Sequence, residues 1–139
     1  MTLNHKVRPD LGWLLDELVA APEARHAILL SADGLMTATS QNVDRDLADR
    51  MAAMASGMQS LSRSGAQFVE PGGSPWEQTM ALYQHGYLFT IAAAAGSFLI
   101  ASAGRDVDVA AFSHQMALTV KRLGPELAVA PRHSQAGTA

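Results

Sequence analysis

The sequence predicts an α/β domain of the α+β type, with a five-stranded antiparallel sheet covered by helices on both faces, in the order α-β-β-α-β-β-β-α. Three observations predict this fold. The Asp33-Gly34 pair separates two short apolar runs, which indicates a β-hairpin. Two nearly continuous apolar runs, at 87–94 and 97–103, are typical of strands buried on both faces. Segments with helical periodicity lie before, between and after the strands, and supply the covering helices.

The first helix and the hairpin occupy the N-terminal third of the chain. The helix is expected to begin at Asp10, whose side chain can cap it, and to end at Pro22. Its leucines fall on one side and would face the sheet: Leu11, Leu14, Leu15 and Leu18. The two hairpin strands are expected at 26–31 and 35–40, joined through Asp33-Gly34.

A long helix is expected from Asp44 to Ser64, capped by Asn42 or Asp44 and roughly 30 Å long. Two apolar stripes follow it at helical spacing. The larger side chains are Leu47, Met51, Met54, Met58 and Leu61, and the smaller ones are Ala48, Ala52 and Ala55. One stripe is enough to pack a helix on its own domain. We therefore interpret the alanine stripe as a surface kept for a second copy of the chain. The alternative is that one wide apolar face is simply deeply buried.

A glycine-rich connection at 68–74 leads to a third strand at 77–83. Gln78 and Thr79 interrupt its apolar residues, which favours a position at the edge of the sheet. The last helix has one apolar face and is expected to stop at Gly124-Pro125. The sequence thus predicts a flexible N-terminus at 1–9, one domain at 10–124 and a loose tail at 125–139.

Composition excludes several classes of function. The net charge is -3 and Lys and Arg do not cluster, so no nucleic-acid partner is expected. There are no cysteines, which excludes disulfides, thiolate catalysis and cysteine metal sites and fits a reducing cytoplasm. The N-terminus has no apolar signal segment, and the longest apolar run, at 87–95, is too short to cross a bilayer. We expect a soluble cytoplasmic protein that does not insert directly into a membrane.

The sequence predicts no catalytic, cofactor-binding or metal-binding residue. The histidines are scattered without metal-ligand spacing, at His5, His26, His85, His114 and His133, and each is interpreted as a surface or strand-end residue. A phosphate-binding Gly-x-x-x-x-Gly-Lys-Ser/Thr loop is missing, so the chain is not itself expected to be a GTPase. No serine lies in a Gly-x-Ser-x-Gly elbow.

The order of elements resembles the roadblock/LC7 family, whose fold is profilin-like, over about residues 11–123. The resemblance rests on the Leu14–Leu18 helix, the Ala27–Leu35 hairpin, the long second helix and the meander at 88–101. The chain is most similar to bacterial members found beside small Ras-like GTPases, in particular short actinobacterial forms encoded with a sensor-kinase-like protein and a GTPase.

This resemblance implies a homodimer formed through the long helix and the edge strand, which scaffolds or regulates a small Ras-like GTPase. A sensor-kinase-like protein is the further partner it implies, with recruitment to the membrane through partners. The expected dimer residues are Ala48, Met51, Ala52, Ala55 and Met80. Four charged residues of the long helix are interpreted as a docking platform for the GTPase, or alternatively as charges that only keep the helix soluble: Asp46, Asp49, Arg50 and Arg63.

A second function class stays open at this point, a sensory module that binds a small ligand on a similar α/β/α sheet. A ligand pocket should combine apolar walls with a few convergent polar groups. The strands instead offer alanine at 92–95, Ala101 and Ala103, which favours close packing of helices on the sheet.

Overall fold

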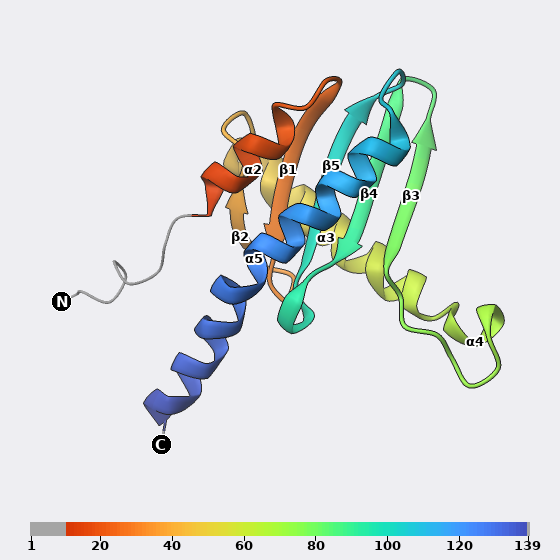
Figure 1. Cartoon of the computed structure of the whole chain (residues 1–139). Helices are drawn as coiled ribbons and strands as arrows, with labels where there is room; N and C mark the ends of the chain where they lie inside the picture. Colours follow the sequence, from red (N-terminus) through yellow and green to blue (C-terminus); the bar gives the residue numbers. More distant parts are fainter. Residues whose placement is uncertain (1–10, 139) are drawn as a thin grey trace.

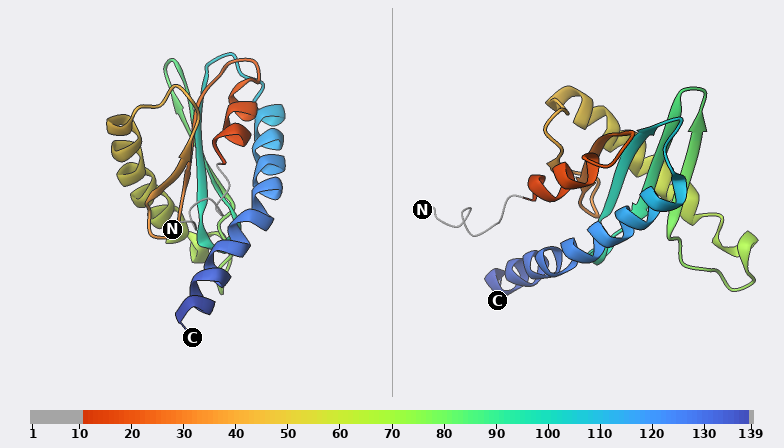
Figure 2. Two further views of the ribbon diagram at one scale, coloured as in Figure 1. Left: turned by 90° about the vertical axis from the view of Figure 1, so that its left-hand side faces the viewer. Right: turned by 45° about the horizontal axis from the view of Figure 1, so that its top comes forward.

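The computed structural model describes residues 11–138, with side chains up to Glu126. One antiparallel sheet has the strand order β2-β1-β5-β4-β3 (Figure 1). Its strands are β1 (Ala24–Leu30), β2 (Met36–Thr39), β3 (Gln78–Tyr83), β4 (Gly86–Ala92) and β5 (Phe98–Gly104). Helices α2 (Gly12–Val19) and α5 (Val109–Thr138) cover one face, and α3 (Arg45–Arg63) covers the other (Figure 2). The predicted five-stranded sheet with helices on both faces is confirmed.

Successive side chains of each strand point to opposite faces of the sheet, so the interior is divided into two cores. On β1, Ala27 and Leu29 pack beneath α2 and α5, whereas Ile28 and Leu30 pack beneath α3. The central strand β5 follows the same rule, with Leu99, Ala101 and Ala103 in the first core and Phe98 and Ile100 in the second. A strand buried on both faces needs apolar residues at every position. This is why the run at 97–103 is almost continuously apolar.

The predicted Asp33-Gly34 turn joins β1 to β2. The backbone N–H of Gly34 donates to the Ser31 carbonyl at 2.9 Å, and the Ser31 N–H donates to the Leu35 carbonyl at 2.9 Å. Gly34 has a φ of 83°, a conformation that a residue with a Cβ atom adopts only with strain. The glycine is therefore required by the backbone of the turn.

Three local features differ from the prediction. The last helix does not stop at Gly124-Pro125 but continues to Thr138, so residues 125–138 are helical instead of forming a loose tail. A proline removes one backbone hydrogen bond, yet the following Glu-Leu-Ala segment consists of strong helix formers that sustain the helix. A short helix, α4 (Ala66–Val69), and a turn of 3-10 helix, η1 (Ala94–Gly96), lie in segments expected to be connections.

The N-terminal predictions fall outside the described residues. These are the flexible segment at 1–9 and the capping role of Asp10. Within residues 11–138, no helix combines the length and the apolar character needed to span a membrane.

Candidate interaction surface

Helix α3 begins where its sequence supplies a cap. Asp44 has extended backbone angles, and its carboxylate accepts a hydrogen bond from the Leu47 N–H at 2.8 Å. The cap satisfies one of the backbone donors that the first turn leaves unpaired. Asp46 in the first turn and Arg63 in the last turn both have the charge that the helix dipole favours.

We expect Asp44→Ala to lower the free energy of unfolding by about 1 kcal/mol, because the capping acceptor is lost. Asp44→Asn is the matched control, since asparagine caps about as well as aspartate. Urea unfolding of both variants would check this. Equal losses in the two variants would contradict a capping role for Asp44.

The alanine stripe of α3 lies on the inner side of the helix, contrary to the prediction, and part of the larger stripe packs against the same core. The alanine stripe, which was expected to meet a second chain, is buried against the protein's own sheet: Ala48, Ala52 and Ala55 all belong to the core beneath α3. Small side chains let the helix axis approach the sheet closely. Of the larger stripe, Met51, Met54 and Met58 are only partly buried, and Leu61 is 75% exposed. The alanines are thus unavailable to a partner. The methionines remain partly accessible, although Met51 and Met54 also pack against this core.

The larger stripe, termed the methionine stripe, consists of Leu47, Met51, Met54, Met58 and Leu61. It faces the β3 side of the sheet. The Thr90 hydroxyl on β4 donates to the Met58 Sδ at 3.3 Å. At the end of the helix, the hydroxyls of Ser62 and Thr79 lie 2.6 Å apart, which ties α3 to β3. Between the stripe and the β3–β4 hairpin lies a hollow of about 350 Å³, whose walls include Met51, Met54, Tyr83, His85 and Leu88. Helix α3 therefore leaves part of its own sheet face uncovered.

Strand β3 is an edge strand, as Gln78 and Thr79 predicted, and within residues 11–138 it pairs only with β4. Its apolar side chains are nevertheless exposed on both faces. Met80 and Leu82 lie opposite Phe89 and Tyr87, on the α5 face, and are 47% and 56% exposed. Tyr83, which lines the hollow beside α3, is also 56% exposed. An edge strand with free backbone groups and apolar side chains is prone to pair with another strand.

The structure therefore brings only some of the predicted dimer-interface residues to one surface. Met51 lines the hollow beside α3, but Met80 lies on the opposite face of the sheet. Sequence reasoning missed Leu82 and Tyr83. The sequence did contain a signal for them, because Leu82 and Tyr83 are adjacent apolar residues in a strand that was already expected at the edge of the sheet. Adjacent residues of a strand point to opposite faces, so one of the two lies on each face.

The four charged residues of the predicted platform are all exposed, but they do not form one cluster. Asp46, Asp49 and Arg50 occupy the first two turns of α3, and Arg45 lies 4.0 Å from Asp49. Arg63 is at the far end of the helix, roughly 20 Å away along the axis. Its guanidinium donates to Gln59 at 2.6 Å and lies 5.5 Å from the ring centre of Trp76.

A family model described as the Roadblock/LC7 domain matches residues 11–103. The chain belongs to the roadblock/LC7 family. A crystal structure of a roadblock/LC7 domain from Streptomyces avermitilis is 38% identical, with a TM-score of 0.79, over 86% of this chain and 98% of that one. No curated protein matches the sequence.

More distant solved structures share the fold of this roadblock/LC7 protein. MglB from Myxococcus xanthus has a TM-score of 0.76 at 10% identity, over 86% of this chain and 95% of that one. The gliding protein MglB from Thermus thermophilus has a TM-score of 0.73 at 14% identity, over 91% of this chain and 93% of that one. At these identities the similarity concerns the arrangement of helices and strands.

Proposed function

We propose that this chain is a non-catalytic homodimeric scaffold or regulator of a small Ras-like GTPase in a bacterial signalling system. The observation that supports it best is the accessible methionine stripe of α3 beside the uncovered edge strand β3. An apolar helix surface and an unpaired strand edge lie next to each other, so one partner can cover both.

A second copy of the chain would supply both a strand edge and an apolar helix surface. If two β3 edges pair about a two-fold axis, the sheets join into one continuous sheet, and such a self-complementary contact is the commonest way to form a dimer. The same rotation would turn the methionine stripe of one α3 toward that of the other, because the stripe lies on the side of α3 that faces β4 and the β3–β4 hairpin. Each helix would then cover the hollow that its partner leaves open.

The GTPase is proposed on the family resemblance. The resemblance also implies a sensor-kinase-like protein as a further partner, and recruitment to a membrane through partners. The test is to titrate a small Ras-like GTPase encoded beside this chain into the purified chain. The GTPase is loaded with GDP or with a non-hydrolysable GTP analogue. We expect at least about tenfold tighter binding of one nucleotide state, and no hydrolysis of GTP by the chain alone. Equal affinities, or no binding of either state, would contradict the proposal.

The exposed charges near the start of α3 are proposed as the rim of the GTPase site. Charged residues at a rim mainly set association rate and partner choice. We expect the double variant Asp49→Lys with Arg50→Glu, which preserves the net charge, to weaken GTPase binding about three- to tenfold at low salt and less at high salt. Titration against wild type checks this, with sedimentation showing that the variant has kept its oligomeric state. Equal affinities at low salt would assign these charges to helix solubility alone.

A further inference from the structure

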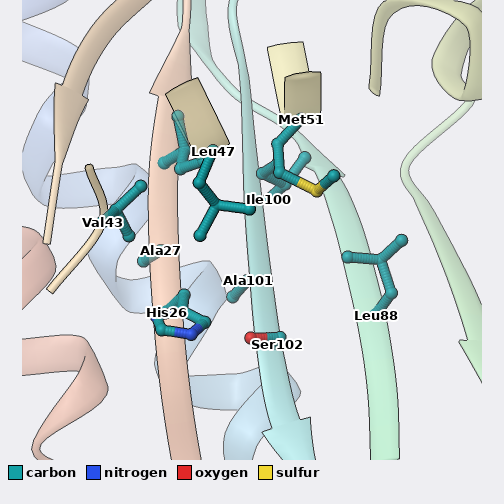
Figure 3. A pocket seen from close by; sticks show the side chains of 10 residues that line it. His26, Ala27, Val43, Leu47, Met51, Leu88, Ile100, Ala101 and Ser102 are labelled. Atoms are coloured by element: carbon teal, nitrogen blue, oxygen red, sulfur yellow. The ribbon is translucent and has the colours of Figure 1, made fainter. Parts of the chain in front are cut away.

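A cavity of about 70 Å³ lies beneath α3. Figure 3 shows side chains that converge on it from α3, from strands β1, β4 and β5, and from the connection before α3, which supplies Val43. Leu47 and Met51 come from α3, Leu88 from β4, and Ile28 and Ile100 from β1 and β5. Apart from two side chains, the walls are apolar.

The two exceptions are His26 and Ser102, which are directly opposite each other in the antiparallel pairing of β1 with β5. Both side chains lie at the same end of the cavity (Figure 3). The His26 Nδ1 and the Ser102 Oγ are buried and have no hydrogen-bond partner among the described residues. Leaving a buried polar group unpaired is costly, and in folded proteins such groups nearly always find a partner. Two neighbouring unpaired groups facing one apolar cavity therefore point to a bound molecule.

The cavity continues into the larger hollow described above. The two spaces share Met51, Leu88 and Ser102, and the hollow leads on to Tyr83 at the edge of the sheet. An engineered apolar cavity of about 150 Å³ holds benzene. A cavity about half that size holds a few non-hydrogen atoms, and a longer molecule can extend from it into the hollow.

We propose that this cavity binds a small uncharged molecule with one hydroxyl or carbonyl group and a short aliphatic body. The polar group would hydrogen-bond to His26 Nδ1 and Ser102 Oγ, and the aliphatic body would pack among Met51, Leu88 and Ile100. Among the described residues, no Asp, Glu, Lys or Arg lines the inner cavity, where an unpaired charge would lose its hydration. Arg25 lines the outer hollow instead. A charged group is therefore disfavoured inside the cavity itself.

The test uses 1-pentanol as the probe, titrated into the full chain carrying ¹³C-labelled methyl groups, with pentanoate as the charged counterpart. We expect saturable shifts of the Ile28, Ile100 and Met51 methyl signals with 1-pentanol, and at least tenfold weaker binding of pentanoate. Ser102→Ala should weaken 1-pentanol binding about fivefold, the net worth of one hydrogen bond. Ser60→Ala, on the exposed side of α3, is the matched control and should bind as wild type does.

Ser102→Val provides a second variant, because it removes the hydroxyl and adds a methyl group to the cavity while suiting a β-strand. It should abolish binding, with an unchanged circular dichroism spectrum as the check on folding. The proposal is overturned if 1-pentanol shifts none of these methyl signals, which is the result expected when the cavity holds only water. It is also overturned if both Ser102 variants bind 1-pentanol as wild type does. The variant Leu61→Glu should still bind 1-pentanol, because Leu61 lines neither the cavity nor the hollow. A loss of the dimer in this variant therefore tests the proposed dimer without testing this site.

Discussion

Replacing Ala55 with arginine is expected to unfold the domain, lowering the free energy of unfolding by more than about 3 kcal/mol. Ala55 is 0% exposed and packs in the core between α3 and the sheet. A long side chain there overfills a packed core, and its charge would be buried without a partner. A loss of this size is a large fraction of the stability of a typical domain.

The matched control is Ala53→Arg, two positions along the same helix on an exposed site. It should change the free energy of unfolding by no more than about 0.5 kcal/mol, because it adds the same charge without displacing core atoms. Urea unfolding followed by circular dichroism would compare the two variants. If Ala55→Arg folds normally and only splits an oligomer, the alanine stripe faces a partner after all.

The alanine stripe marks the limit of what periodicity can predict. The spacing of Ala48, Ala52 and Ala55 correctly indicated one face of a helix, and the spacing of the methionines indicated another. Periodicity gives the angle between two stripes but does not say which one meets the sheet. Backbone separation decides this, since short side chains let α3 lie close to strands that already contribute bulky residues such as Ile28 and Phe98.

The sheet was more predictable, because strand signals are local. The Asp33-Gly34 turn and the two apolar runs placed β1, β2, β4 and β5 within about two residues, and Gln78-Thr79 placed β3 at the edge. The predicted end of α5 was wrong, because Gly124-Pro125 was interpreted as a stop and the helix-forming residues that follow it were not considered.

The cavity could not have been predicted from single residues. His26 was interpreted as a surface or strand-end histidine because no metal-ligand spacing surrounds it. The structure instead places its Nδ1 in the interior. The available signal was alternation, since His26 shares a face of β1 with Ile28 and Leu30. Its juxtaposition with Ser102 depends on the β1–β5 register, which brings together residues that are far apart in the sequence.

The proposed dimer gives the other large expected effect. Met54→Glu, in the middle of the methionine stripe, should weaken self-association about 30- to 100-fold, because two carboxylates would be buried close together across the two-fold axis. Met54 is also partly buried against its own core, so this variant could lose some stability. Leu61→Glu avoids that problem, since the Leu61 side chain is already 75% exposed in the single chain. It should leave unfolding of the single chain unchanged and still weaken the dimer.

Sedimentation equilibrium over a range of micromolar concentrations measures this effect, with Ala53→Glu as the control for an added charge on the exposed side of α3. We expect the wild type and Ala53→Glu to sediment as dimers, and Met54→Glu and Leu61→Glu as monomers that keep the wild-type circular dichroism spectrum. A wild type that is monomeric at these concentrations would contradict the dimer itself. A dimer that survives both stripe variants would instead assign self-association to another surface, such as the exposed Met80 and Leu82 on the α5 face.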